Sequence, residues 1–369
     1  MTERGSTIRS IGLISATTIG AGIFALPYVF FKAGWLTAVF YLVILGTLMV
    51  VVHLLYWRVL KVTEGRERLL GLTRNYLGRK GFALAIFSVI GGLLLALVAY
   101  LVLAGQFGKM IAPELGKGAT ILVFWALSSL PLILRGRRFV KLELAGGIFM
   151  GLAILLIFFS AWPFETLVLP ETWNTENIFL PFGIILFSLA GWTAVEPVFD
   201  SQNQMDLKQG KRVFTGGTVL VVLIYMIFII SVFSLTSEIT PNTISGLSDW
   251  PRIKLAILGF FGLFALWTSY LPIGLEIRSL VERDLKWPKF LSLGLILAVP
   301  PALVALGLND FLEVIGLVGG IFLALQYVLI ILIAKKTLAP NRGTRALLNF
   351  MVLVFGLGAI YEIYYFIIR

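Results

Sequence analysis

The sequence predicts an all-α polytopic membrane protein with about 11 transmembrane helices. Of its 369 residues, 59% are hydrophobic and 13% are charged, and the mean hydropathy is +0.97. Soluble domains contain about 45–50% apolar and about 25% charged residues, so a soluble chain of this composition could not cover its surface with polar groups. The apolar residues form runs of about 20, the length of a membrane-spanning helix, and the alternating segments of a β-barrel do not occur.

Charged stretches and stretches rich in proline and glycine separate the apolar runs and set the boundaries of the predicted helices. The predicted spans are residues 8–31, 34–57, 81–107, 118–134, 138–160, 179–201, 213–236, 254–279, 289–307, 310–333 and 346–367. The longest connection, Arg58 to Lys80, has room for a short interfacial helix around Arg68–Tyr76. No connection is long enough for a folded extramembrane domain, so residues 1–369 are expected to form one transmembrane domain.

The distribution of lysine and arginine predicts the orientation. If the N-terminus is cytoplasmic, 24 of the 30 basic residues lie on the inner side, as the positive-inside rule requires. We therefore expect a multi-pass protein of the cell (cytoplasmic) membrane, with its N-terminus cytoplasmic and its C-terminus outside. The net charge of +11 is explained by this topology, and no nucleic-acid partner is expected.

Two of the predicted spans contain residues that a continuous lipid-facing helix would avoid. The first contains Thr17 and the run Gly20-Ala21-Gly22 before Pro27, and the sixth contains residues 188–192 (SLAGW) before Glu196-Pro197. Glycine costs a helix interior about 1 kcal/mol and proline about 3 kcal/mol. Both spans share the pattern Ala-Gly-x-x-Ala. Paired interruptions in corresponding helices indicate the substrate site of a secondary transporter, although glycines can also serve close helix packing.

These segments resemble a known family. Residues 18–28 (TIGAGIFALPY) and 32–35 (KAGW) resemble the first-helix signature of the amino acid/auxin permeases, in particular their prokaryotic aromatic amino acid permease-like branch. Residues 187–191 (FSLAG) and 268–271 (TSYL) resemble further motifs of that family. The resemblance implies the LeuT-type fold of the amino acid–polyamine–cation superfamily. In that fold residues 8–160 and 179–333 would be two inverted five-helix repeats, and residues 346–367 an additional helix.

The resemblance also implies a secondary active transporter of a neutral or aromatic amino acid that works by alternating access. An amino acid needs donors for its carboxylate, which the N–H groups of a half-helix beginning after Gly20 could supply. It also needs acceptors for its ammonium group, which carbonyls at the sixth-span break could supply. The substrate-binding residues are accordingly expected to be Thr17, Gly20, Ala21, Gly22, Tyr100, Phe187, Ser188, Ala190 and Trp192.

The eighth span offers a candidate sodium site. Ala265, Thr268 and Ser269 share one helical face, and two hydroxyl groups with helix-end carbonyls are suitable ligands for Na⁺. In related symporters the first helix adds carbonyls, at positions that correspond here to Ala16 and Ile19. The alternative is that both hydroxyls only bond to carbonyls of their own helix. A second cation site is not expected, because Ile23 stands where relatives place an amide.

Proton coupling is the competing mechanism. Glu196 is the candidate proton-binding residue, because carboxylates within membrane spans are costly and generally have a function. Of the other acids, Glu276 is expected in an ion pair near an inner helix end, and Glu362 is expected to be solvated near the outer surface. The only histidine, His53, is expected to have a structural role at the interface.

Other function classes are less compatible with the sequence. ATP-driven transport within the chain is excluded, because the sequence has no phosphate-binding loop motif. The chain lacks cysteine and any cluster of acidic or histidine ligands, so we expect neither an enzyme nor a cofactor other than Na⁺ or H⁺ as coupling ion. A non-transporting amino acid sensor of the same fold remains an alternative function. The expected partners are a small-molecule amino acid and the lipid bilayer; the sequence does not decide the oligomeric state.

Overall fold

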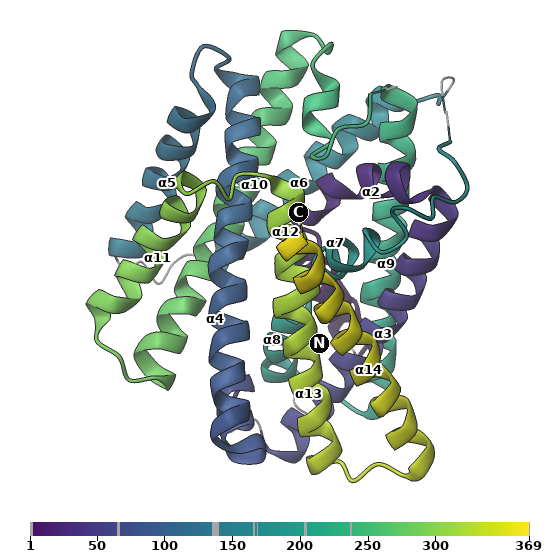
Figure 1. The fold of residues 1–369 in the computed structure, drawn as a ribbon, viewed down its shortest axis with the longest axis vertical. Helices are drawn as coiled ribbons and strands as arrows, with labels where there is room; N and C mark the ends of the chain where they lie inside the picture. Colours follow the sequence, from purple (N-terminus) through teal and green to yellow (C-terminus); the bar gives the residue numbers. More distant parts are fainter. Residues whose placement is uncertain are drawn as a thin grey trace.

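The computed structural model describes residues 3–64, 67–134, 140–164, 167, 169–202, 205–236 and 238–368. These ranges are largely helical and contain no strand (Figure 1). The first half contains α1 (Glu3–Thr18), η1 (Ala21–Ala25), α2 (Leu26–Ala33), α3 (Trp35–Val62), α4 (Leu69–Ile111), α5 (Lys117–Leu134) and α6 (Val140–Ala161). The second half contains α7 (Pro181–Ser188), η3 (Trp192–Ala194), α8 (Val195–Ser201), α9 (Leu207–Leu235), η4 (Ile244–Leu247), α10 (Arg252–Ser279), η5 (Leu280–Asp284), α11 (Lys289–Ala305), α12 (Phe311–Leu317), η6 (Val318–Leu323), α13 (Ala324–Thr337) and α14 (Arg342–Ile368).

The described helices match the predicted spans. Seven of them are long and apolar enough to cross a membrane, or eight if the bent pair α1 and η1–α2 counts as one span. Three shorter apolar helices, Lys117–Ile133, Gly146–Ala161 and Lys289–Ala305, occupy the other three predicted spans. The all-α polytopic architecture is confirmed, and the number of eleven spans is compatible with it. Residues 135–139, in a predicted inner loop, lie outside the described part of the chain.

The short helix predicted before the third span is present. The helix α4 contains a break at Gly78, with φ 70° and ψ −165°, so residues 69–77 form a separate short helix before the long one. This backbone conformation is accessible to glycine and strained for other residues. The glycine therefore lets the chain turn between the short helix and the membrane-spanning helix.

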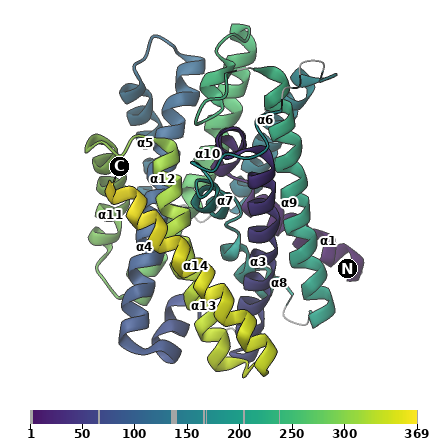
Figure 2. The ribbon, with the colours of Figure 1, turned by 45° about the vertical axis from the view of Figure 1, so that its right-hand side comes forward.

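The N-terminal half of the first span, α1, lies at one side of the bundle (Figure 2). Its axis is bent by 55° from that of η1–α2. One face of α1 packs against α9, whereas Gly5, Ile8, Arg9, Gly12 and Ala16 are exposed. These residues are three or four positions apart and so share one helical face.

The additional helix α14 crosses the outside of the bundle obliquely (Figure 2). It packs against α13 and η6 and reaches α12 and α7 with its C-terminal part. The segment η6 is a single π-helical stretch between α12 and α13. The half-helix α7 is therefore covered on one side by η6 and α14.

Candidate functional site

Both predicted helix interruptions are present. In the first span α1 ends at Thr18, Gly20 has extended backbone, and the chain resumes as the short 3₁₀ turn η1 before α2. In the sixth span α7 ends at Ser188, and η3 precedes α8. The first N–H groups of a helix and the last carbonyls have no partner within it. Each break therefore places backbone groups that lack a partner within their own helix in the interior of the protein.

The two breaks contact each other reciprocally. A Cβ atom on Gly22 would lie 2.5 Å from Ser188 Oγ and 2.8 Å from Ser188 Cα. A Cβ atom on Gly191 would overlap the hydroxyl of Thr18. Gly22 and Gly191 are the equivalent glycines of the shared Ala-Gly-x-x-Ala pattern, so each break inserts a hydroxyl residue against the glycine of the other. This arrangement is what two inverted repeats meeting at their broken helices would produce.

A tyrosine from α9 joins the two breaks. The hydroxyl of Tyr225 lies 2.6 Å from the carbonyl oxygen of Ser188 and 3.1 Å from that of Thr18. The carbonyl of Phe187 accepts the N–H of Ala190 at 3.1 Å. The carbonyls of Phe187 and Ser188, which we expected to be free for a substrate ammonium, thus already have protein partners. Each carbonyl oxygen keeps a second lone pair. The sequence did not indicate Tyr225, because a tyrosine in an apolar helix resembles ordinary packing.

Replacement of Tyr225 by phenylalanine is expected to loosen the junction. It removes the only hydroxyl that the described contacts place on both carbonyls, and loss of such a hydrogen bond costs about 0.5–1.5 kcal/mol. We expect a lower thermal unfolding temperature and weaker substrate binding. Tyr327→Phe is the matched control, because Tyr327 is fully buried on α13 and its hydroxyl has no hydrogen-bond partner among the described residues. Equal effects of the two changes would contradict the bridging role.

The other predicted substrate residues are only partly brought together. The hydroxyl of Tyr100 lies 3.9 Å from the position of a Cβ atom on Gly20, and Ala21 is buried in η1 beside it. Trp192 instead points to α3, where its ring centroid lies 6.1 Å from that of Tyr56. The remaining three, half-buried at the ends of the broken segments, are Thr17, Phe187 and Ala190.

The predicted sodium ligands lie beside a glycine pair of α6. A Cβ atom on Gly146 would overlap the hydroxyl of Thr268, and a Cβ atom on Gly147 would lie 3.8 Å from the Cβ of Ala16. The structure thus places α1 and α10 on neighbouring parts of α6, near the end of α1 where Ile19 lies. The hydroxyls of Thr268 and Ser269 both donate to the carbonyl of Ala265, at 2.9 and 3.0 Å. A hydroxyl that donates one hydrogen bond keeps its lone pairs for a further contact.

Glu196 belongs to a polar cluster on the predicted inner side. Its carboxylate accepts a hydrogen bond from the hydroxyl of Tyr56 at 2.5 Å and lies 3.5 Å from the guanidinium of Arg68. Arg68 also pairs with Asp200 at 2.7 Å. The cluster therefore connects α3, the start of α4 and α8. Nearby, the amide of Gln202 donates to Ser6 and Ser10 of α1.

The charge of Arg68 suits this connecting role. Burial by itself lowers the pKa of Arg68, but the hydrogen bond to Asp200 and the charges of both carboxylates outweigh it and raise the pKa above its ordinary value. The guanidinium consequently remains protonated. The sequence missed Arg68, because it lies far from α8 along the chain and looks like one of many basic loop residues.

The structure also places three other polar residues. His53, for which a structural role is expected, is 1% exposed, and its ring lies beside Gly191 and 6.2 Å from the ring of Phe214. Glu362 is 8% exposed and not solvated. The ion pair expected for Glu276 is not found among the described residues, and Arg278, two positions further along the chain, pairs with Glu282 at 3.1 Å.

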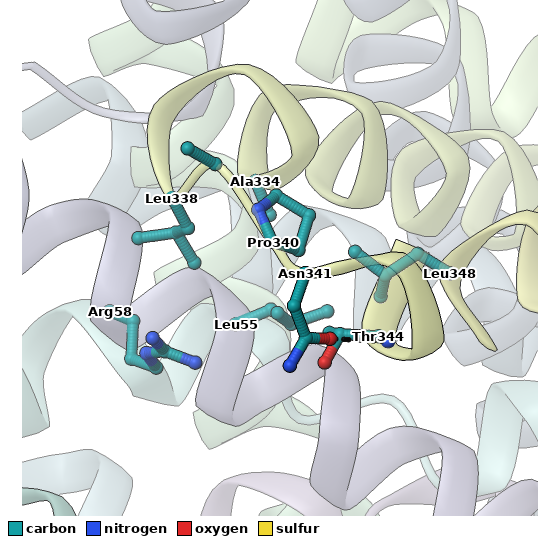
Figure 3. A pocket seen from close by; sticks show the side chains of 9 residues that line it. Leu55, Arg58, Ala334, Leu338, Pro340, Asn341, Thr344 and Leu348 are labelled. Carbon is teal, nitrogen blue, oxygen red and sulfur yellow. Dashed lines mark hydrogen bonds between the residues drawn. The ribbon is translucent and has the colours of Figure 1, made fainter. Parts of the chain in front are cut away.

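A cavity of about 230 Å³ lies away from the breaks, where α3 and α13 meet the start of α14. Figure 3 shows Arg58, Asn341 and Thr344 around it, together with apolar side chains. None of the predicted substrate or ion ligands lines this cavity. The break region, and not this cavity, thus remains the candidate functional site.

Comparisons with known proteins agree with this geometry. The model of the tryptophan/tyrosine permease family matches residues 3–360. No curated protein sequence matches the chain. Among solved structures, MhsT in complex with L-phenylalanine has a TM-score of 0.68 and 15% identity, covering 95% of this chain and 98% of that one.

Two further solved structures have the same architecture. A mutant of the Eremococcus coleocola manganese transporter has a TM-score of 0.64 and 11% identity, covering 96% of this chain and 85% of that one. Mhp1, a nucleobase-cation-symport-1 family transporter with bromovinylhydantoin bound, has a TM-score of 0.55 and 14% identity. The match covers 87% of this chain and 76% of that one. The LeuT-type fold is confirmed, and at these identities the similarity extends to the fold alone.

Proposed function

The chain belongs to the tryptophan/tyrosine permease family, and we therefore propose that it is a sodium-coupled symporter of an aromatic or other neutral amino acid. The coarser function, a secondary amino acid transporter and not an enzyme, follows from the family and the fold. The observation that carries the proposal is the reciprocal contact of the two breaks. That contact places the start of η1 and the end of α7 side by side.

The break region supports amino acid binding by its backbone. The N–H groups at the start of η1 and the positive end of its dipole would bind the substrate carboxylate. The second lone pairs of the α7 carbonyls would accept from the ammonium group. Tyr100 lies beside Gly20, so an aromatic or aliphatic substrate side chain would extend toward α4. The experiment is uptake of labelled tryptophan, tyrosine, phenylalanine and leucine into proteoliposomes under separately imposed Na⁺ and H⁺ gradients.

Sodium coupling is supported by the buried hydroxyl of Thr268 and by its position next to α6 and α1. We expect the double variant Thr268→Ala/Ser269→Ala to lose sodium-stimulated uptake, with at least about a tenfold higher Na⁺ requirement, since tenfold corresponds to about 1.4 kcal/mol. Ser231→Ala is the matched control, because the Ser231 hydroxyl also donates to a carbonyl of its own helix, at 2.7 Å. Uptake by the unmodified protein driven equally well by protons without sodium would refute this mechanism.

A proton-coupled permease that uses Glu196 is the second candidate. It is favoured by the burial of this carboxylate next to Tyr56, whereas the pairing with Arg68 favours a gate role. The two roles differ in Glu196→Gln. A proton carrier would lose proton-driven accumulation and keep exchange of substrate across the membrane. A gate residue would change the rate of uptake under either ion gradient and leave the coupling ion unchanged.

A non-transporting sensor of the same fold would share every contact described above. It would bind an amino acid without moving it. Substrate-dependent thermal stabilisation combined with no uptake and no exchange under any gradient would therefore establish the sensor and exclude the symporter.

A further inference from the structure

The cavity at the predicted inner end of the bundle has no part in the transport site described above. Its volume is about 230 Å³, and it lies where the last turns of α3 and α13 meet the start of α14. Pockets for drug-sized molecules occupy about 300–1,000 Å³. The cavity in Figure 3 is therefore of a size for a small chemical group held between three helices.

Three polar side chains in the wall of the cavity are hydrogen-bond donors. Arg58 of α3 offers the N–H groups of its guanidinium, and Asn341 and Thr344 at the start of α14 offer an amide NH₂ group and a hydroxyl. In the described part of the chain, none of these side-chain donors has a hydrogen-bond or ion-pair partner. The side-chain oxygen of Asn341 is already engaged, because it accepts the N–H of Thr344 at 2.9 Å and so caps α14. The polar part of the wall thus presents donors.

The cavity also lacks a negative charge to balance Arg58. Neither aspartate nor glutamate is among the residues that line it. Arg58 is half-buried, and a charged group that is partly removed from water without a partner is unfavourable. Phosphate oxygens match the planar fork of a guanidinium and accept two parallel hydrogen bonds from it. The wall is therefore complementary to a phosphate group.

The rest of the wall is apolar and adjoins an exposed apolar surface. Leu55 of α3, Leu338 after the end of α13 and Leu348 of α14 line the cavity. Next to Leu348 on α14, Leu347 is 47% exposed, and Phe350 is 59% exposed. Lipid tails are as apolar as leucine, so this face of a membrane span suits acyl chains. A phospholipid could use both the cavity and this face, whereas a free phosphate ion could use only the cavity.

Further basic residues surround the cavity. Lys335 and Lys336 end α13, and Arg342 and Arg345 are exposed in the first turn of α14. Basic pockets between membrane helices bind anionic lipid headgroups, and clusters of lysine and arginine at the membrane surface attract anionic lipids. The electrostatic field at this end of the bundle therefore favours a lipid with a net negative charge.

We propose that this cavity binds the phosphate of an anionic phospholipid, with Arg58 as its main ligand and the acyl chains along the exposed face of α14. Asn341 and Thr344 donate hydrogen bonds to the same phosphate. The bound headgroup joins the end of α3 to the start of α14. This lipid site does not depend on which substrate or coupling ion the protein transports.

The test is the binding of short-chain phospholipids to the delipidated full-length protein in detergent. Thermal stabilisation as a function of concentration gives the affinity for dioctanoyl phosphatidylglycerol, dioctanoyl phosphatidylcholine and inorganic phosphate. We expect phosphatidylglycerol to bind at least about tenfold more tightly than either of the others, because only it combines a net negative charge with acyl chains. Equal affinity for inorganic phosphate would identify a free-anion site, and equal affinity for phosphatidylcholine would refute recognition by charge. Either result would overturn the proposal.

Arg58→Gln removes the main ligand. We expect it to weaken phosphatidylglycerol binding about tenfold or more, as loss of a hydrogen-bonded charged partner predicts. Arg212→Gln is the matched control, because Arg212 is exposed near the start of α9, on the same predicted side, and does not line the cavity. It should bind the lipid as the unmodified protein does. Equal losses in the two variants would indicate general attraction to a basic surface and would overturn the site.

A second pair of variants serves if Arg58→Gln does not fold. Thr344→Val keeps the shape of the side chain and removes one donor, so we expect binding about two- to fivefold weaker. Thr337→Val is its control, because the Thr337 hydroxyl already donates to the carbonyl of Ile333 at 3.0 Å and the residue does not line the cavity. Unchanged affinity in Thr344→Val, or the same loss in Thr337→Val, would contradict the proposed phosphate contacts.

Discussion

Gly22→Ala is expected to lower substrate affinity by about ten- to a hundredfold. The added Cβ would lie 2.5 Å from Ser188 Oγ and 2.8 Å from Ser188 Cα, and the second of these atoms is backbone that cannot rotate away. The two breaks must separate to admit the methyl group. Overpacking of this kind costs about 1–3 kcal/mol, and about 1.4 kcal/mol corresponds to a tenfold change in affinity. Substrate-induced thermal stabilisation and uptake measure the loss, and Gly22→Leu should have a larger effect.

The control for Gly22→Ala is Gly12→Ala in the same span. A Cβ atom on Gly12 meets nothing within 4 Å, so alanine there adds helix propensity without a collision. It should bind substrate as the unmodified protein does. Unchanged binding in a folded Gly22→Ala protein would remove the substrate site from the junction of the breaks.

Arg68→Ala is expected to reduce the maximal rate of uptake about tenfold. The change leaves Glu196 and Asp200 as two carboxylates without their shared cation, and the side chain of Glu196 is only 20% exposed. Glu196 then keeps only the hydrogen bond from Tyr56, and loss of a partner by a largely buried charged group costs about 1–3 kcal/mol. We expect the state in which α8 is held against the start of α4 to lose population, with a larger effect on the rate than on substrate affinity.

An exposed ion pair provides the comparison. Arg252 and Glu114 are 3.0 Å apart, and both side chains are 72% exposed. Surface pairs contribute about 0–1 kcal/mol, so Arg252→Ala should change uptake by less than about fivefold. If Arg68→Ala were as mild as Arg252→Ala, the inner polar cluster would not be a gate.

Most of the fold could be predicted from local sequence properties. Each membrane span is an apolar run whose length the bilayer sets, and each break is marked by glycine and proline within that run. The breaks at residues 20–22 and 188–192 could therefore be predicted without any knowledge of tertiary contacts. The family resemblance then supplied the pairing of the two halves, which local patterns alone do not give.

Contacts between distant spans could not be predicted in the same way. Tyr225 bonds to Ser188 and Thr18, which are 37 and 207 residues away, Arg68 pairs with Glu196 of another helix, and neither residue is unusual in its own helix or loop. Glu362 was misplaced for a related reason. Its position near a helix end suggests solvent, and only the packing of α7 and η6 over α14 buries it.

The exposed face of α1 has a consequence for local stability. This helix carries more polar residues than an ordinary membrane span, and its residues from Gly5 to Ala16 leave one face uncovered. Local opening of α1 would have to break its packing against α9. The Gln202 hydrogen bonds to Ser6 and Ser10 and the hydrogen bond from the Ser15 hydroxyl to the carbonyl of Gly217 restrain the helix further, so its exposed face does not imply easy detachment.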